Sequence, residues 1–554
     1  MNDVNTNLSR RRLLVATGAV GVTAAVAAAP RHAAAQTTPA VRGPVTVGPS
    51  DPRYADLVAG LERRWVATPD SVRVVFTPAQ AAAVVQEAVT TGKRLTVRGG
   101  GHCYEDFVFN AEVDIVLDLS EMTSVEHDPA HNAIAVQAGA TLLDVYDLLY
   151  KAWGITLPAG QCYSVGVGGH VPGGGWGLLC RREGLVVDHL YAVEVVVVDA
   201  NGRARTVLAT RERDDPNRDL WWAHTGGGGG TFGVVTRYLF RSPGVTSTDP
   251  ATLLPRPPAE VVLSAIAWSW DTLTEAAFST LVRNFGDWHA ANSAPGGAYG
   301  GLCAFLNLNH RATGEISLFT KMDGDRPDSD QLLARFTAAI TNGVTAPHTA
   351  VTQPSAEHGP MAELATPKRW SWLTATRYLG TIHPRLLDPT LRGDHKSAYH
   401  HKGFTAAQIA IIFDRLSRNG FANPLAQVTL SSYGGQVNAV GRTDTALVHR
   451  DSAFKVLFQT SWTEAADDTA NVAWLRELYE QVYVRTGKVP VANEQTSGCF
   501  VNYCDTDISE QAHNTSGVPW HTLYWGENYP RLQQTKARWD PADFFRHRQS
   551  VRLP

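Results

Sequence analysis

The sequence lacks the short motifs that define several common enzyme classes. Its six cysteines include no Cys-x-x-Cys pair, and it contains no His-Glu-x-x-His, no Gly-x-Ser-x-Gly and no Gly-Lys-Ser/Thr segment. A zinc centre of the usual spacing, a hydrolase nucleophile elbow and a Walker phosphate loop are therefore excluded. We expect no metal site in this chain.

An excess of positive charge is also missing. The chain carries 49 basic and 53 acidic residues, which gives a formal net charge of −4 at pH 7. This balance offers no electrostatic reason to expect nucleic acid as a partner. Beyond the N-terminus, no apolar run reaches the ~20 residues that a membrane-spanning helix needs. A length of 554 residues exceeds what one hydrophobic core usually serves, so we expect two or more domains.

Residues 1–35 have the layout of an export signal. Arg10–Arg12 precede an apolar run that ends near Ala29, and Ala33–Ala35 provides a cleavage site of small residues. Paired arginines are typical of the twin-arginine route, which exports folded proteins and therefore suits a protein that acquires a cofactor in the cytoplasm. A membrane anchor is the alternative, but the run falls short of ~20 residues. We expect an exported holoprotein, with residues 36–67 as its leader.

Alternating strand and helix patterns follow the leader. Proline is dense between residues 250 and 258, which indicates a linker before a second region of mixed helices and strands. Apolar periodicity and turn residues predict the following elements: strands at 72–76, 94–97, 114–118, 133–137, 193–199 and 204–208, and helices at 78–89, 142–153, 273–284, 328–341 and 405–419.

Glycine is concentrated in three segments, Arg98–His102, Gly166–Gly177 and Gly226–Gly230, and a fourth, shorter glycine-bearing segment is Trp525–Asn528. Glycine lets a backbone approach a ligand closely and point several N–H groups at it, which suits a pyrophosphate. A Rossmann fingerprint requires Gly-x-Gly-x-x-Gly at the start of a helix. Here Pro172 stands where that helix should continue. The alternative, that the segments are only turns, is disfavoured because five consecutive glycines cost folding entropy.

Several segments resemble one enzyme family, the vanillyl-alcohol-oxidase superfamily with a PCMH-type FAD-binding domain. Within it the chain is similar to the berberine-bridge-enzyme-like branch, and most to the actinobacterial bicovalent oxidases that modify antibiotics and their sugars. The resemblance covers nearly all of the chain after the signal, with the segments in family order. The segments that carry it are Arg98–Asp106, Gly160–His170, Gly173–Gly175, Gly184–Asp188, Asp219–Trp222, Gly226–Val235, Val501–Tyr503, Tyr524–Leu532 and Asp540–Phe545.

The resemblance implies an α+β fold in three parts. The first is a two-subdomain PCMH-type FAD-binding domain at residues 68–245. The second is an α+β substrate-binding domain with an antiparallel sheet at residues 246–492. The third is a berberine-bridge-like segment at residues 493–554 that returns to the FAD domain.

The resemblance also implies FAD that is bonded twice to the protein. The position of His102 is where a ring nitrogen bonds the flavin 8α-methyl, and the position of Cys162 is where a thiolate bonds C6. Both atom types are nucleophiles that can add to an oxidised flavin; the alternative for each is a packed core residue. The other expected cofactor-binding residues are Arg98, Gly99, Gly100, Gly101, Cys103, Val167, Gly168, Gly169, His170, Gly173, Gly177, Gly229, Gly230, Val234, Tyr503 and Asn528.

Four residues carry the expected catalysis. Tyr524 occupies the position of the tyrosine that takes the substrate proton, and Val165 occupies the position that gates oxygen in the family's oxidases. Relatives often have a second tyrosine where this chain has Trp176, whose indole cannot accept a proton. Tyr524 therefore either works alone or is helped by Tyr163 or Tyr503, while Trp176 stacks on a sugar or aromatic face.

The sequence therefore predicts an oxidase that acts on a small molecule. The expected reaction takes hydride from an alcohol or hemiacetal carbon of a sugar-bearing or polyketide-like natural product and reduces O2 to H2O2. Two alternatives stay open: cyclisation or desaturation on the same flavin, and a protein that sequesters its ligand. Oligomeric state and disulfides stay open too, with Cys499 and Cys504 as the obvious local pair.

Overall fold

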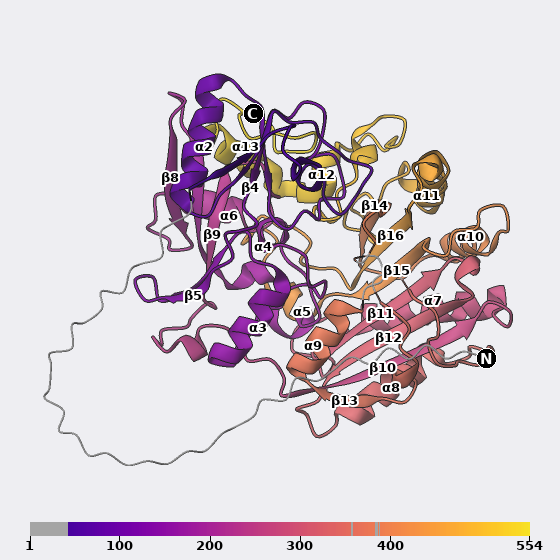
Figure 1. Cartoon of the computed structure of the whole chain (residues 1–554). Coiled ribbons are helices and arrows are strands. Elements are labelled where there is room, and N and C mark those ends of the chain that lie inside the picture. Colours follow the sequence, from indigo (N-terminus) through magenta and orange to yellow (C-terminus); the bar gives the residue numbers. More distant parts are fainter. Residues whose placement is uncertain (1–42, 356–357, 383–385, 387) are drawn as a thin grey trace, which may run out of the picture. The chain divides into compact units, whose positions relative to one another are not determined.

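The computed structural model describes residues 43–355, 358–382, 386 and 388–554 (Figure 1). The expected signal, residues 1–35, lies outside the described residues, as does the start of the leader. All contacts reported below lie within Gly43–Pro554. In the described part of the chain, no helix combines the length and the apolar character needed to cross a membrane.

A four-stranded sheet forms the first subdomain. Three of its strands, β2, β4 and β3, pair in parallel, and the edge strand β1 pairs antiparallel to β2. Strand β1 lies inside the segment assigned to the leader, so part of that segment is paired with the first sheet. The strands, in sheet order, are β1 (Val45–Val47), β2 (Ser71–Val74), β4 (Ile115–Asp118) and β3 (Leu95–Arg98).

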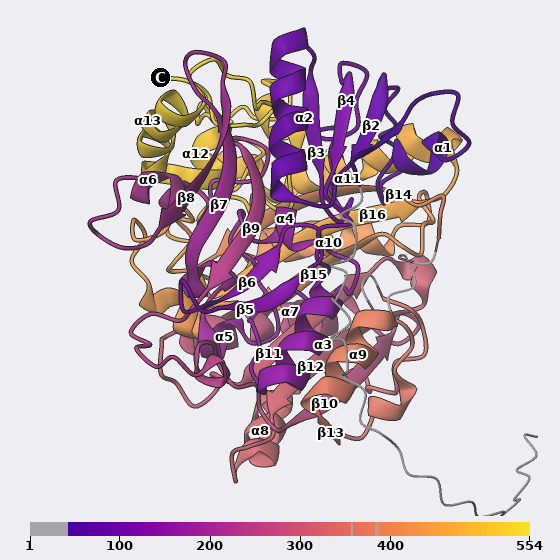
Figure 2. The ribbon, with the colours of Figure 1, turned by 60° about the vertical axis from the view of Figure 1, so that its left-hand side comes forward.

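A five-stranded antiparallel sheet forms the second subdomain. The helix α2 (Pro78–Thr91) packs against strands of both sheets (Figure 2). Its N-terminus is capped by Thr77, whose hydroxyl accepts the N–H of Gln80, and it ends at Gly92 in the left-handed conformation. The strands, in sheet order, are β5 (Val125–Asp128), β6 (Ala133–Gln137), β9 (Val234–Phe240), β7 (Leu190–Val198) and β8 (Ala204–Thr210).

Short helices complete this FAD-binding region and place its loops. The predicted helix at residues 142–153 is confirmed as α3, which Thr141 caps and Gly154 ends. The other helices are α1 (Tyr54–Leu57), α4 (Val167–His170), α5 (Cys180–Glu183) and α6 (Arg218–Ala223).

A seven-stranded antiparallel sheet forms the middle region, as predicted. Its strands, in sheet order, are β13 (Lys368–Ser371), β10 (Glu260–Ser269), β12 (Glu315–Asp323), β11 (Leu302–Asn309), β15 (Gln427–Ser432), β16 (Phe454–Trp462) and β14 (Arg392–His400). Its helices are α7 (Glu275–Ala291), α8 (Ser329–Thr341), α9 (Trp372–Thr381), α10 (Ala406–Ser417) and α11 (Asp468–Val482).

The two faces of strand β16 are chemically different, although every one of its residues is buried. The rings of Phe454 and Phe458 contact Phe285 of α7 and Tyr479 of α11. Because side chains alternate along a strand, Lys455 faces away from these helices. Strand β16 therefore presents a buried cation to the FAD-binding region.

The C-terminal segment returns to the FAD-binding region, as predicted. Its helices are α12 (Trp520–Trp525) and α13 (Tyr529–Trp539). The indole N–H of Trp525 donates to the carbonyl of Gly226 at 3.0 Å, and Nζ of Lys536 donates to the carbonyl of Thr231 at 2.7 Å. These bonds hold the third glycine segment from the C-terminal side.

Candidate active site

One cavity collects the three glycine segments and the C-terminal segment. Strand β3 ends at Arg98 and leads into the first glycine segment, while α4 lies within the second. The residues predicted for the site that line this cavity are Arg98, Gly99, Gly100, Gly101, His102, Cys103, Cys162, Val165, Gly168, Gly169, His170, Trp176, Gly229, Gly230, Val234, Tyr503 and Tyr524.

The first two glycine loops touch each other through their backbones. A Cβ on Gly100 would lie 2.3 Å from the amide nitrogen of Gly166, so no side chain fits there. The amide N–H groups of Gly99, Gly100 and Gly101 donate to no acceptor in the described part of the chain. Unpaired N–H groups that line a cavity suit the oxygens of a pyrophosphate. The residues present therefore fit a dinucleotide such as FAD.

His102 is held between these two loops. One of its ring nitrogens, Nε2, lies 2.9 Å from the hydroxyl oxygen of Ser164. Burial lowers the pKa of His102 to about 4, so its imidazole is neutral near pH 7 and keeps a nucleophilic nitrogen lone pair. Cys162, two residues before Ser164, lines the same cavity. The contact between His102 and Ser164 thus brings the two expected flavin-bonding residues to one place.

Val165 also reaches the cavity, and its place is fixed by the backbone. Its carbonyl accepts the N–H of Leu142 at 2.9 Å, and its own N–H donates to the carbonyl of Cys162 at 3.3 Å. The side chain is partly buried against the hydrophobic core. It therefore serves as packing as well as lining the cavity beside Cys162.

The geometry does not support Tyr524 as the proton acceptor. Its phenol oxygen accepts the N–H of Asp505 at 3.1 Å and donates to Oε1 of Gln549 at 3.2 Å. Burial raises the pKa of Tyr524 well above 10, and nearby Cys499 adds to the effect. A phenol that resists ionisation is a poor base near neutral pH.

Tyr503, unlike Tyr524, has a cation as the hydrogen-bond donor to its phenol oxygen. The ammonium group of Lys455, a buried residue of β16, donates to its phenol oxygen at 2.8 Å. A cation that donates to a phenol oxygen stabilises the phenolate form. Tyr503 lines the cavity, so the structure favours Tyr503 over Tyr524 as the group that takes a proton.

Sequence reasoning missed Lys455, although a signal was present. A lysine between Phe454 and Val456, in an apolar run that predicts a buried strand, must have a partner because unpaired buried cations are costly. That partner, Tyr503, is 48 residues further along the chain and could not be identified from local pattern.

Trp176 contacts the same ammonium group of Lys455. The Lys455 nitrogen lies 3.7 Å from the centroid of the Trp176 ring, an attractive cation–π geometry. The indole N–H donates to the carbonyl of Ser432 at 3.2 Å, and Phe305 packs edge-on at 5.6 Å. Trp176 is therefore fixed as a wall of the cavity that faces Lys455.

Five predicted site residues do not line the cavity, namely Tyr163, Val167, Gly173, Gly177 and Asn528. The glycines serve packing: a Cβ would lie 1.9 Å from Oδ1 of Asn502 at Gly173, and 1.6 Å from the carbonyl oxygen of Ala159 at Gly177. Val167 opens α4. Tyr163 lies next to Cys162 in the chain, but its side chain is not part of the cavity lining.

Asn528 acts on a neighbouring loop. Its amide nitrogen donates to the carbonyls of Arg442, Thr445 and Ala446 at 2.8, 3.2 and 3.1 Å. These bonds order the loop that leads to Leu447. Leu447 packs against Gly226, where an added Cβ would lie only 2.2 Å from the Leu447 backbone nitrogen. Asn528 therefore has a structural role in this loop, and its expected role in cofactor binding stays a prediction.

The structure joins none of the six cysteines in a disulfide, so the suggested pair of Cys499 and Cys504 is not formed. The sulfur of Cys499 lies 3.5 Å from the hydroxyl of Tyr479, whereas Cys504 contacts Cys103 across the cavity wall. The two cysteines therefore have different neighbours.

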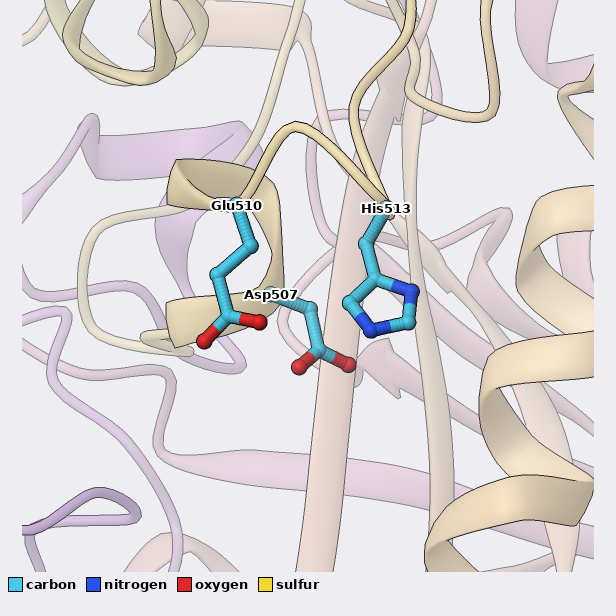
Figure 3. Close-up of side chains that lie close together, drawn as sticks. All are labelled: Asp507, Glu510 and His513. Atoms are coloured by element: carbon cyan, nitrogen blue, oxygen red, sulfur yellow. The ribbon is translucent and has the colours of Figure 1, made fainter.

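A cluster of Asp507, Glu510 and His513 has the spacing of a metal site (Figure 3). Its ligand atoms already have partners, however. Nζ of Lys396 and the guanidinium of Arg476 each lie 2.6 Å from the Asp507 carboxylate. The Nδ1 atom of His513 lies 2.7 Å from a carboxylate oxygen of Glu480. These ion pairs account for the cluster as part of the fold.

Taken together, the sheets and the glycine-lined cavity define an FAD-linked oxidoreductase. The chain matches the family model described as FAD binding domain over residues 69–207, and the model described as berberine and berberine like over residues 499–552.

Curated relatives identify the family more closely. The chain is 47% identical to aclacinomycin-N/aclacinomycin-A oxidase of Streptomyces galilaeus, with 98% of this chain and 96% of the relative covered. It is 32% identical to hexose oxidase of Chondrus crispus, with 90% and 93% covered. The chain belongs to the berberine-bridge-enzyme-like FAD-linked oxidases.

Solved structures agree with this assignment. The crystal structure of aclacinomycin oxidoreductase is 46% identical with a TM-score of 0.86, and covers 93% of this chain and 100% of that one. Glycopeptide hexose oxidase, solved in complex with teicoplanin, is 42% identical with a TM-score of 0.85, covering 92% and 99%.

Proposed function

We propose that this FAD-dependent oxidoreductase oxidises an alcohol or hemiacetal carbon of a sugar-bearing or polyketide-like natural product, with O2 reduced to H2O2. The names of its relatives, an aclacinomycin oxidase and two hexose oxidases, support this substrate class. The observation that carries the proposal is the 2.8 Å bond between Lys455 and Tyr503 in the cavity that also holds His102 and Cys162. FAD, when bound, supplies the hydride acceptor and the path of electrons to O2.

Two protein nucleophiles would hold the cofactor. With Nε2 of His102 engaged by Ser164, Nδ1 is the ring nitrogen that we assign to the bond with the 8α-methyl group. The thiol of Cys162 would supply the second bond, to C6. Two bonds keep the cofactor in place without deep burial, so one side of the cavity can admit a bulky substrate.

Proton transfer is the work of the chain's own residues. Tyr503 accepts the hydroxyl proton of the substrate, and Lys455 offsets the negative charge that its phenolate carries before that transfer. The ring face of Trp176 fixes the position of the Lys455 ammonium group beside Tyr503. Val165, beside Cys162, leaves the small apolar space through which O2 approaches.

The test is turnover of purified holoprotein with glycosylated polyketides and free hexoses in air. The proposal predicts consumption of O2, release of H2O2 and a product two hydrogens lighter that reacts with a carbonyl-trapping hydrazide. A product of the same mass that resists trapping would establish cyclisation or desaturation instead. A flavin that stays oxidised with every ligand bound would favour a sequestering protein.

Export is part of the proposal. Substitution of Arg10 and Arg11 by Lys should keep the flavoprotein inside a host that uses the twin-arginine route, whereas the natural sequence should release it. Equal release of both forms would contradict this route.

A further inference from the structure

Two cysteines directly follow the proposed flavin-bonding histidine and the proposed proton acceptor in the chain. Cys103 follows His102 and Cys504 follows Tyr503, and both cysteines line the cavity. The two thiols lie close enough for each to shift the pKa of the other, although they are 401 residues apart in the sequence. Both sulfurs are in the reduced thiol state.

The two segments that carry these thiols are tied together beside them. The carboxylate of Glu105 accepts the N–H of Thr506 at 2.9 Å and its hydroxyl at 3.2 Å. On the other side, the rings of Tyr104 and Tyr503 lie 5.9 Å apart. These contacts hold the segment that carries Cys103 beside the segment that carries Cys504.

The thiols differ in acidity. Cys103 accepts hydrogen bonds from the thiol of Cys504 and from the N–H groups of Glu105 and Phe107, which hold its pKa below 9. The hydrogen bond to Cys103, together with burial, raises the pKa of Cys504 well above 9. Cys103 is thus the more nucleophilic sulfur, and Cys504 keeps its proton to higher pH.

We propose that Cys103 and Cys504 form a reversible disulfide in response to hydrogen peroxide, which makes this pair an oxidation site within the enzyme's own cavity. The inference rests on the proposed function for its source of peroxide, because an oxidase releases H2O2 into the same cavity. The modification itself needs only the two sulfurs and the peroxide.

The chemistry balances in two steps. The Cys103 thiolate attacks one peroxide oxygen, the O–O bond breaks, and the departing hydroxide takes a proton to become water. The sulfur of Cys504 then attacks the resulting sulfenic acid at Cys103. The S–O bond breaks, and the second hydroxide leaves as water with the Cys504 proton. Two thiols and one peroxide give one disulfide and two waters.

The bond would couple oxidation to activity. A disulfide draws two sulfurs to about 2.05 Å, closer than any hydrogen-bonded pair. Because Cys504 adjoins Tyr503, the shift moves the phenol relative to Lys455, whose ammonium group is held on Trp176. We expect oxidised enzyme to turn over more slowly by roughly fivefold, the effect of about 1 kcal/mol, and to recover with dithiothreitol.

The test treats purified holoprotein with a few equivalents of H2O2, alkylates the remaining thiols after denaturation, and maps the peptides by mass. The expected result is loss of two alkylated sites and one cross-linked peptide pair that contains Cys103 and Cys504. In Cys504→Ser the expected product is a dimedone-reactive Cys103, and Cys303→Ser, a buried cysteine remote in sequence, is the matched control that should still cross-link. Both cysteines remaining alkylated in the peroxide-treated natural protein would overturn the proposal, as would a cross-link to another partner.

A second arm separates this inference from the proposed function. The same mapping is repeated during turnover with an oxidisable sugar substrate in air, with and without catalase. Cross-linking that catalase prevents supports both claims. If added peroxide forms the disulfide but incubation with substrates in air does not, the proposal for Cys103 and Cys504 is supported and the oxidase assignment fails.

Discussion

The ammonium group of Lys455 lies 2.8 Å from the phenol oxygen of Tyr503 and 3.7 Å from the ring centroid of Trp176. One buried cation therefore links the sheet of the middle region to a residue of the second glycine segment and to the C-terminal segment. A relative with tyrosine in place of Trp176 would offer a second phenol at this point. Here the indole cannot accept a proton, so Tyr503 is the phenol of this group that we propose as the proton acceptor.

Removal of the Tyr503 hydroxyl should abolish most of the turnover. In Tyr503→Phe we expect kcat to fall by about 10²-fold or more, the usual contribution of a positioned base, with flavin content unchanged. Tyr524→Phe should retain kcat within about tenfold, because its hydroxyl bonds only to Asp505 and Gln549. Steady-state oxygen consumption measures both variants. The reverse order of effects would restore Tyr524 as the base.

Removal of the Lys455 charge should change the pH dependence of turnover. Lys455→Met deprives the Tyr503 phenolate of its counterion, so the acidic limb of the pH–rate profile should move to higher pH. Lys402→Met, at an exposed lysine paired with Glu494, is the control and should leave the profile in place. An unshifted profile in Lys455→Met would mean that the ion acts only in packing.

The hydroxyl of Ser164 should affect the bond between His102 and the flavin, and not the bond between Cys162 and the flavin. In a Cys162→Ala background, where His102 is the sole expected anchor, Ser164→Ala should lower the share of flavin that stays with acid-precipitated protein. The cause is loss of the 2.9 Å contact that orients the imidazole. In a His102→Ala background the same change should have little effect. Equal losses in both backgrounds would argue for general disruption of the loop.

Buried histidines should make the fold sensitive to acid. Burial lowers the pKa of His289, His400 and His449 to about 3, whereas their unfolded value is near 6.5. The unfolded chain therefore binds protons that the folded chain refuses, and stability present above pH 6.5 is lost as the pH falls towards 3. Each pKa unit corresponds to about 1.4 kcal/mol. Circular dichroism should show Tm falling between pH 7 and pH 5; a constant Tm would contradict these values.

Local pattern was sufficient for much of the fold. The helix at residues 142–153 and the strand at residues 133–137 were predicted with the bounds that the structure has, because caps and apolar periodicity are written in neighbouring residues. The edge strand Val45–Val47 was missed. It is too short for periodicity to register, and it is held by pairing with β2 rather than by its own composition.

The site was predictable only in part, for a related reason. The glycine segments could be assigned to a nucleotide because their chemistry is local. The base could not, because what distinguishes Tyr503 from Tyr524 is a partner on a distant strand and the burial around each phenol. Motif position alone points to Tyr524, whereas the contact with Lys455 points to Tyr503.

The most direct measurement of the central claim, that two nucleophiles on two loops hold one flavin, is the flavin retained by acid-denatured protein. The account predicts that yellow colour and the flavin mass stay with the natural polypeptide and with His102→Ala and Cys162→Ala singly. The double variant should release all of its flavin. Release from the natural protein, or retention by the double variant, would contradict it.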